Sequence, residues 1–126
     1  MLAPTVRQKT DALAAFRALA EPLPARYLLV GTHASYAYQQ WLLPIRKMID
    51  LRIRPQDLSQ WQMAFPPSWT VLTEIPSSTQ MRAATRLVRL ETTLDDALYQ
   101  RRRSVNGLNV IAPEDLAMEL LARTAT

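Results

Sequence analysis

Residues 27–38 read YLLVGTHASYAY, and this stretch decides the fold class. Its first four residues are apolar and have the length of a short buried strand. Gly31 is one of only 2 glycines in the chain, so we expect a backbone geometry there that other residues adopt poorly. Thr32 predicts the cap of a helix that runs to Trp41. A strand, Gly-Thr and a helix together offer backbone N–H groups to a phosphate, although many proteins without such a ligand also turn from strand to helix at a glycine.

The next predicted strand carries residues that could hold a metal ion beside a phosphate bound at this turn. Residues 48–53 alternate between the two faces of a strand, and the more polar face holds Met48, Asp50 and Arg52. Two acidic residues at i and i+2 of this face could hold a divalent metal against the phosphates of a nucleotide. Here those positions are Met48 and Asp50, and a thioether is not the hard oxygen ligand that magnesium prefers. The sequence therefore predicts half of an acidic pair.

The rest of the chain alternates between helical and extended patterns. Helices are predicted from residue 5 or 10 to 20, over 55–63 and 93–103, and from 113 onward; strands are predicted over 69–75, 86–91 and 105–111, with a loop at 76–78. Asn106 and Gly107 allow the last of these strands to be a small hairpin. No repeat, low-complexity stretch or linker interrupts the sequence. The pattern predicts a mixed α/β (α+β) fold in a single domain, residues 1–126.

Composition excludes several classes of protein. The 126 residues are 48% hydrophobic and 21% charged, which is ordinary for a globular domain. There is no cysteine, which excludes disulfides and thiolate metal sites and indicates a reducing compartment. Charged residues at positions 7, 9, 11 and 17 argue against a signal peptide, and no apolar run is long enough to cross a bilayer. We therefore expect a cytoplasmic protein with no membrane partner.

Residues 28–38 resemble the opening motif of a bacterial branch of the nucleotidyltransferase superfamily, the group typified by DNA polymerase beta. In that family the motif leads to a strand that reads Asp-x-Asp-Leu, and this sequence has MIDL at residues 48–51, at about the same separation. The family's third carboxylate lies on a later strand, which residues 87–91 (LVRLE) match. The tail, residues 96–116, also resembles the family's closing section. The resemblance covers Tyr27 to Leu121, most of the chain.

This resemblance implies a mixed sheet with helices mainly on one face and a nucleotide site beside it. Gly31, Thr32 and His33 would contact the nucleotide. If the chain were active, with magnesium and ATP, Asp50 and Glu91 would be the catalytic carboxylates and Asp50 a weak metal ligand. His33 is the only histidine, and a lone histidine in the first turn of a helix is more often structural.

Two departures from the family pattern change the expected function. Met48 replaces the first acid, and Arg89 stands where the third is expected. Arg89 could bind a phosphate of the nucleotide or form a metal-free salt bridge with Asp50, and we favour the salt bridge. Active transfer needs several carboxylates for its metal ions. We therefore predict a degenerate, non-catalytic member of the family that needs no cofactor and binds a partner or a nucleotide.

Two other functions remain open. One is a residual metal-dependent nucleotidyltransferase that uses Asp50 and Glu91. The other is a basic nucleic-acid-binding or toxin–antitoxin-type regulatory module, because the chain has a net charge of +4 and a dense run at Arg101, Arg102 and Arg103. Arg82, Arg86 and Arg89 could extend that run if the fold brings them together. The same run also fits a helix C-terminus, which favours cations, and we prefer that interpretation. A protein partner or a homodimer is plausible.

Overall fold

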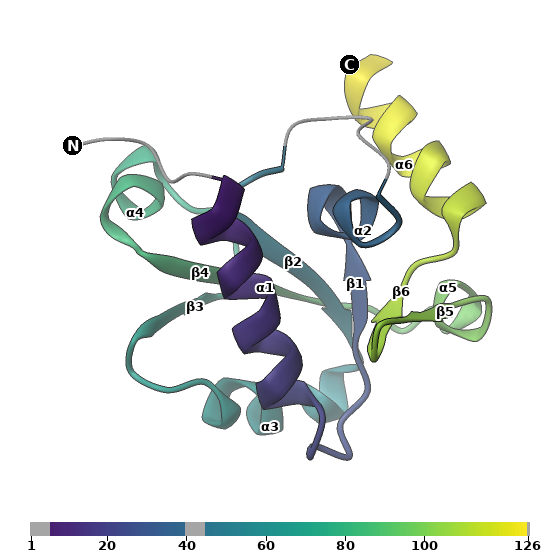
Figure 1. Ribbon diagram of the computed structural model, residues 1–126. Coiled ribbons are helices and arrows are strands. Elements are labelled where there is room, and N and C mark those ends of the chain that lie inside the picture. Colours follow the sequence, from purple (N-terminus) through teal and green to yellow (C-terminus); the bar gives the residue numbers. More distant parts are fainter. Residues whose placement is uncertain (1–5, 40–44, 126) are drawn as a thin grey trace.

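The computed structural model describes residues 6–39 and 45–125, with side chains for residues 10–39 and 45–122. In chain order the elements are α1 (Val6–Ala20), β1 (Leu28–Val30), α2 (Gly31–Ala37), β2 (Met48–Ile53), η1 (Pro55–Asp57), α3 (Leu58–Ala64), β3 (Trp69–Leu72), α4 (Ser78–Ala83), β4 (Arg86–Thr92), α5 (Ala97–Gln100), β5 (Arg103–Val105), β6 (Leu108–Val110) and α6 (Pro113–Ala125). The strands form one six-stranded sheet in the order β3-β4-β2-β1-β6-β5 (Figure 1). The predicted mixed α/β class is confirmed.

The sheet is mixed in direction. Strands β3, β4 and β2 form a parallel half, because β4 pairs in parallel with both β2 and β3. On the other side of β2, β1 runs antiparallel to β2 and parallel to β6. The hairpin of β5 and β6 completes that edge, and its turn residues Asn106 and Gly107 have φ values of 51° and 81°. An Asn-Gly pair adopts these positive φ values readily, which confirms the predicted hairpin.

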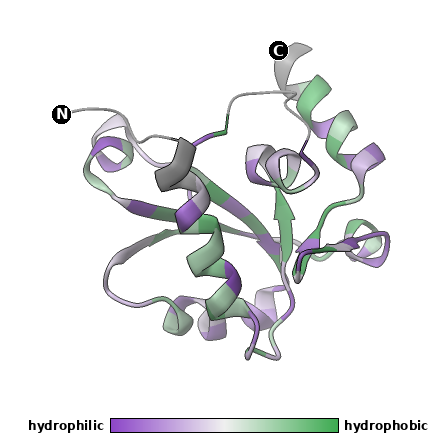
Figure 2. Ribbon diagram, viewed as in Figure 1, coloured by the Kyte–Doolittle hydropathy of each residue, from purple (hydrophilic) through white to green (hydrophobic). Residues whose placement is uncertain are grey.

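The register divides the sheet into an apolar face and a charged face. Leu51 lies opposite Leu29 on β1 and Leu90 on β4, and all three side chains are buried. Residues one position along have their side chains on the other face, where Asp50 lies opposite Arg89. Figure 2 shows the hydrophobic character of β1 against the alternation along β2. The alternation predicted for residues 48–53 is confirmed.

Helices α1 and α3 cover the apolar face, and α1 lies across the sheet in Figure 1. Phe16 of α1 and Trp61 of α3 are fully buried, and their rings lie 5.9 Å apart. Tyr27 packs edge-on against both rings, at 5.1 Å from Phe16 and 5.5 Å from Trp61. Such edge-to-face contacts add to the stability that burial already provides. None of the helices in the described ranges combines the length and the apolar character needed to span a bilayer.

Helix α2 starts earlier than the sequence predicts. Its first residue is Gly31 and its N-cap is Val30, which makes no side-chain capping bond. Thr32, the predicted cap, lies inside the first turn, and its Oγ1 accepts a hydrogen bond from the backbone N–H of Arg46 at 2.8 Å. The prediction that Thr32 caps the helix is therefore wrong, because the positive φ of Gly31 turns the chain one residue earlier. The predicted helix end, Trp41, lies outside the described residues.

Other boundaries also differ from the prediction. Strand β3 ends at Leu72, before the predicted end at residue 75. The predicted loop at residues 76–78 leads into α4, which Ser77 and Gln80 start with reciprocal side-chain-to-backbone bonds, a capping box. The helix predicted over residues 93–103 shortens to α5, and Arg103 belongs to β5 instead. Strand pairing in the hairpin outweighs the helical signal of the arginine run.

Candidate functional site

Arg89 lies between two carboxylates on the charged face of the sheet. Its Nε is 3.5 Å from Oδ1 of Asp50, on the neighbouring strand β2. Its Nη2 donates a 2.7 Å hydrogen bond to Oε2 of Glu91, two residues along β4. Strand β4 directs both residues to the same face because they are at i and i+2. The salt bridge that the sequence predicts between Arg89 and Asp50 is present.

The ionic contacts continue beyond Glu91. Nε of Arg52, on β2, is 3.6 Å from Oε1 of Glu91. The guanidinium of Arg52 also binds both carboxylate oxygens of Glu119 on α6, with Nη2 at 2.8 Å from Oε1. Acidic and basic side chains therefore alternate across β2, β4 and α6, and we call this set the charged row: Asp50, Arg89, Glu91, Arg52 and Glu119.

The charged row keeps Arg52 charged. Burial lowers the pKa of Arg52, but the hydrogen bonds to Glu119 and the nearby carboxylates raise it by more, so its pKa lies above the ordinary value. The side chains of Asp50, Arg52 and Arg89 are 12%, 18% and 21% exposed, against 32% for Glu119 and 43% for Glu91. Ion pairs at this depth are screened less by salt than pairs on the surface.

Gly31 lies against the inner end of the charged row. Its φ is +73°, and a Cβ at this position would be 3.2 Å from Oδ2 of Asp50. The structure therefore places the start of α2 directly beside Asp50. The side chains of Thr32 and His33 in the same turn are buried, with 3% and 0% of the residue exposed. That burial favours a structural role for His33.

Met48 takes no part in the ionic contacts. It is 4% exposed and packs with Ala84 and Leu87 in a second apolar cluster, against Met81 of α4. Lys47, one residue earlier, holds α4 in place because its Nζ donates a 2.7 Å hydrogen bond to the carbonyl oxygen of Met81. Met48 thus contributes packing at the position where the family has its first acid.

These residues do not fit the two-magnesium site that the resemblance implies. Magnesium prefers hard oxygen ligands in octahedral geometry. Here a guanidinium lies between Asp50 and Glu91, and an apolar cluster surrounds Met48. In the part of the chain that the structure describes, no three His, Asp or Glu side chains group as a metal site. Asp50 and Glu91 are brought together through Arg89, which contacts both.

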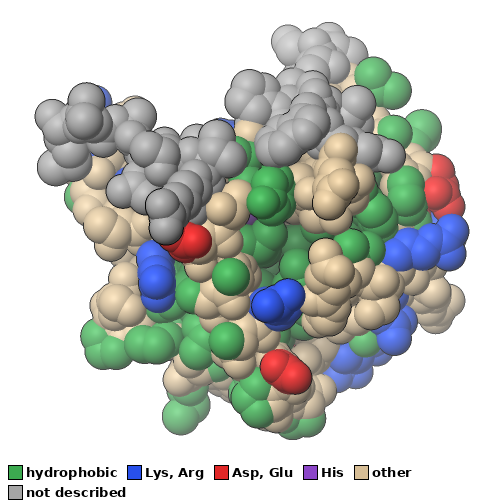
Figure 3. Space-filling model, in the orientation of Figure 1, with side chains coloured by type: hydrophobic (Ala, Val, Ile, Leu, Met, Phe, Trp, Pro, Cys, Tyr) green, Lys and Arg blue, Asp and Glu red, His purple; other side chains and the backbone are tan. Residues whose placement is uncertain are grey.

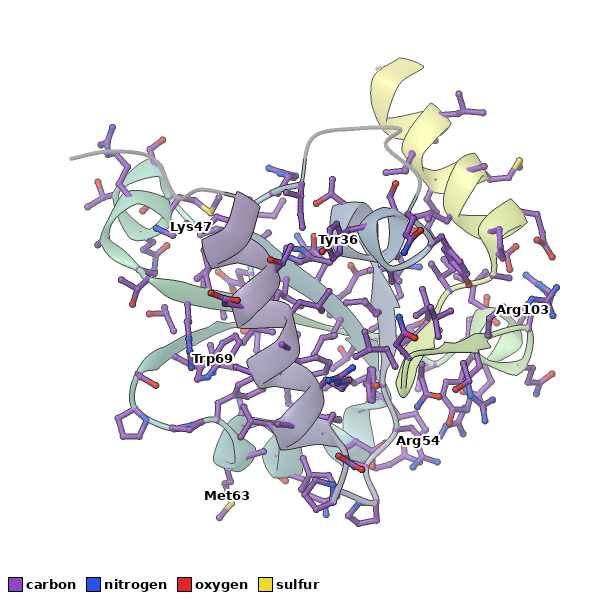
Figure 4. The ribbon with its side chains drawn as sticks, viewed as in Figure 1. Tyr36, Lys47, Arg54, Met63, Trp69 and Arg103 are labelled. Carbon is purple, nitrogen blue, oxygen red and sulfur yellow. The ribbon has the colours of Figure 1, made fainter. Side chains whose placement is uncertain are left out.

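The arginine run does not merge with the other arginines. Arg101 binds Asp115 through two hydrogen bonds of 2.9 and 3.1 Å, and Arg103 lies 3.8 Å from Glu114. Arg86 lies on β4, which three strands separate from β5. Its guanidinium is over the ring of Trp69, and Figure 4 shows Trp69 and Arg103 on opposite sides of the molecule. Figure 3 likewise shows basic side chains at separate places on one face. The extension of the run through Arg82, Arg86 and Arg89 is wrong.

A cavity of about 260 Å³ adjoins the charged row at Arg52 and Glu91. It lies between the start of β1, the ends of β2 and β4, and α5, and Arg52 and Glu91 belong to both its wall and the charged row. Sequence reasoning missed this cavity and also the partner of Arg52, Glu119. Arg52 was visible on the polar face of its strand, but no local pattern links it to a helix 67 residues away.

Comparison with known proteins adds no assignment. A scan against protein-family models finds no match to this chain, and searches of the curated proteins and of the solved structures find no match either. The nucleotidyltransferase resemblance therefore stays a prediction from the sequence motifs.

Proposed function

We propose that this chain is a degenerate nucleotidyltransferase-like domain that does not catalyse nucleotidyl transfer and that acts by binding a protein partner or a nucleotide without magnesium. The observation that carries the proposal is the place of Arg89, between Asp50 and Glu91. A metal ion shared by these carboxylates would have to displace the guanidinium from both of them. Two cations in one site repel each other, so the side chain and the metal exclude one another.

The chemistry of transfer supports the same conclusion. Phosphoryl transfer depends on metal ions that neutralise charge and on a carboxylate that orients the attacking oxygen. Asp50 and Glu91 are both ion-paired with arginine, and Met48 supplies no oxygen ligand. No described contact favours the residual enzyme over the non-catalytic domain.

Contacts of the basic run weaken the nucleic-acid alternative. Arg101 and Arg103 are each paired with an acidic residue at the start of α6, which reduces the charge that they offer to phosphates. As the binding partner of this domain, we prefer another protein or a second copy of the chain to nucleic acid. The absence of cysteine fits a reducing compartment, so we extend the proposal to a cytoplasmic protein of bacterial type.

The test is calorimetric titration with ATP, with and without magnesium, on the wild type and on two variants. We expect no magnesium-dependent binding by the wild type. Arg89→Asp removes the guanidinium, and the double variant Met48→Asp with Arg89→Asp also restores the first acid; each should gain binding of magnesium and ATP. Arg103→Asp, which makes the same charge change at a side chain that is 59% exposed, is the matched control and should gain none.

One outcome would overturn the proposal. Magnesium-dependent ATP binding by the wild type at micromolar strength, lost in Asp50→Asn, would mean that Asp50 and a second carboxylate still form a metal site. Circular dichroism of each variant shows whether it has folded. If Met48→Asp disrupts the apolar cluster around Met48, the single variant Arg89→Asp tests the proposal by itself.

A further inference from the structure

The cavity beside the charged row lies where α/β proteins often bind ligands. Strands β2 and β4 are parallel, and the cavity opens at their carboxyl ends, next to Ile53 and Thr93. Ligands of open α/β sheets commonly occupy the crevice outside the carboxyl ends of the strands. Its volume of about 260 Å³ is near the lower end of ligand pockets, so it suits a small molecule.

Two arginines of the cavity wall are held in fixed positions. Arg54 donates from Nε and Nη2 to both carboxylate oxygens of Asp57, at 2.7 and 3.3 Å. The guanidinium of Arg26 lies over the ring of Tyr99 at 3.7 Å, and its Nη2 is 3.4 Å from Asp96. A guanidinium has five N–H donors, so each arginine keeps N–H groups beyond these contacts. Preorganised donors lose less entropy when a ligand binds.

Tyr99 is itself fixed between two cations. The guanidinium of Arg102 lies 3.9 Å from the ring centroid, and that of Arg26 lies 3.7 Å from it. Two guanidiniums this close to one centroid must be on opposite faces of the ring. Each contact is a cation–π interaction, which adds stability when the groups are partly buried. These contacts tie Tyr99 of the 4-residue helix α5 to arginines on either side of its ring.

Formal charge in the cavity wall is balanced. The wall holds three arginines and three carboxylates, which are Arg26, Arg52, Arg54, Glu91, Asp95 and Asp96. A polyanion such as a nucleoside triphosphate would face all three carboxylates in a small space. A singly charged anion can reach the spare arginine donors at a lower electrostatic cost. The remaining wall includes the apolar side chains Leu28, Ile53 and Leu98, which favour an apolar body on the ligand.

From this geometry we propose that the cavity binds a small organic carboxylate with a compact apolar or aromatic body. Arg54 and Arg26 hold the carboxylate, because a guanidinium presents parallel N–H donors that match its two oxygens. Leu98 and Ile53 contact the body. This inference names a binding site for the proposed non-catalytic domain. Carboxylate binding in the cavity does not depend on whether the charged row can hold a metal. Either proposal can therefore fail while the other stands.

The test is a titration with benzoate, followed by calorimetry and by chemical shifts of the protein. We expect wild-type binding with a Kd of about 1 mM or tighter, and a loss of at least about tenfold in Arg54→Gln and in Leu98→Gln. Benzyl alcohol, which lacks the anion, and inorganic phosphate, which lacks the body, should bind at least about tenfold more weakly. ATP should not compete with benzoate.

Two controls keep the result specific. Arg103→Gln removes an exposed arginine outside the cavity and should leave benzoate binding unchanged. Arg82→Gln, at an exposed arginine of α4 outside the cavity wall, should also leave it unchanged. No benzoate binding, equal binding of benzyl alcohol, or binding that survives both Arg54→Gln and Leu98→Gln in folded proteins would each overturn the proposal.

Discussion

Arg89 joins two carboxylates that would repel each other if it were absent. Asp50 and Glu91 lie on adjacent strands, and each contacts the guanidinium of Arg89. Ion pairs at partly buried positions contribute little net stability, but removing one partner leaves the other charge without compensation. The cost of losing Arg89 should therefore exceed the net contribution of the pairs.

We expect Arg89→Met to lower the free energy of unfolding by about 1–3 kcal/mol. Methionine keeps the aliphatic length but leaves the carboxylate of Asp50, in a side chain only 12% exposed, without its cation. Urea unfolding at pH 7 measures the change. Arg103→Gln, at a side chain that is 59% exposed, should change stability by less than about 0.5 kcal/mol. Equal effects of the two substitutions would show that the partial burial of the Arg89 pair has no energetic importance.

At the scale of single residues, some contacts could be predicted and others could not. The pairing of Asp50 with Arg89 follows from strand alternation, because both residues lie on the polar faces of strands that the sequence already indicates. The contact between Arg52 and Glu119 depends on how α6 packs against the sheet, which is a tertiary property. Arg26 and Arg54 were missed for the same reason, since they meet only where the start of β1 adjoins the end of β2.

The turn from β1 into α2 depends on Gly31 in two ways. Its φ of +73° strains any residue with a side chain, and a Cβ there would also approach Oδ2 of Asp50 to 3.2 Å. Gly107 in the hairpin has a similar φ of +81°, but a Cβ there would meet only Cδ of Arg17, at an ordinary 3.7 Å. A comparison of substitutions at the two glycines therefore separates the cost of backbone strain from the cost of steric crowding.

Gly31→Ala should destabilise the protein by at least about 2 kcal/mol, and Gly107→Ala by about 1–2 kcal/mol. The difference measures the contact with Asp50. Urea unfolding of both variants checks the order, and adding Asp50→Ala to Gly31→Ala should recover part of the extra loss. If Gly107→Ala proves the more damaging substitution, the β1–α2 turn is not as tight as the contact distance indicates.

Element boundaries were predictable where one local signal acted alone. Strand β2 has the bounds that its alternation predicts, and α1 ends at Ala20 as predicted. The prediction failed where signals competed. The arginine run looks like a helix C-terminus, but the Asn-Gly turn after it pairs Arg103 with Val110 in the hairpin. Helix α4 was missed because the capping residues Ser77 and Gln80 follow a proline that reads as a loop.

At the scale of the whole molecule, Tyr27 connects the aromatic core to β6, the strand that pairs with β1. Its ring packs against Phe16 and Trp61, and its hydroxyl oxygen accepts a 3.0 Å hydrogen bond from the backbone N–H of Asn109. Burial raises the pKa of Tyr27 above its ordinary value, and the bond from Asn109 offsets part of that rise. The folded protein therefore favours the neutral phenol.

Alkaline pH should weaken the fold through this residue. Because the pKa of Tyr27 is raised in the folded state, its contribution is fully present below about pH 10 and is lost as pH rises through the folded pKa. Urea unfolding from pH 8 to 11.5 should show a smaller decline for Tyr27→Phe than for the wild type. The variant should start about 1 kcal/mol less stable, since Asn109 loses its acceptor. Parallel curves for the two proteins would refute this account.

The charged row also determines how β4 aligns with β2 while the sheet forms. In the native alignment Asp50 faces Arg89, and Arg52 faces Glu91. A shift by one residue would turn these charges onto the apolar face. A shift by two residues in one direction would set Asp50 against Glu91, and in the other direction Arg52 against Arg89, so like charges would meet either way. The ion pairs of the charged row thus select one strand alignment among its nearest competitors.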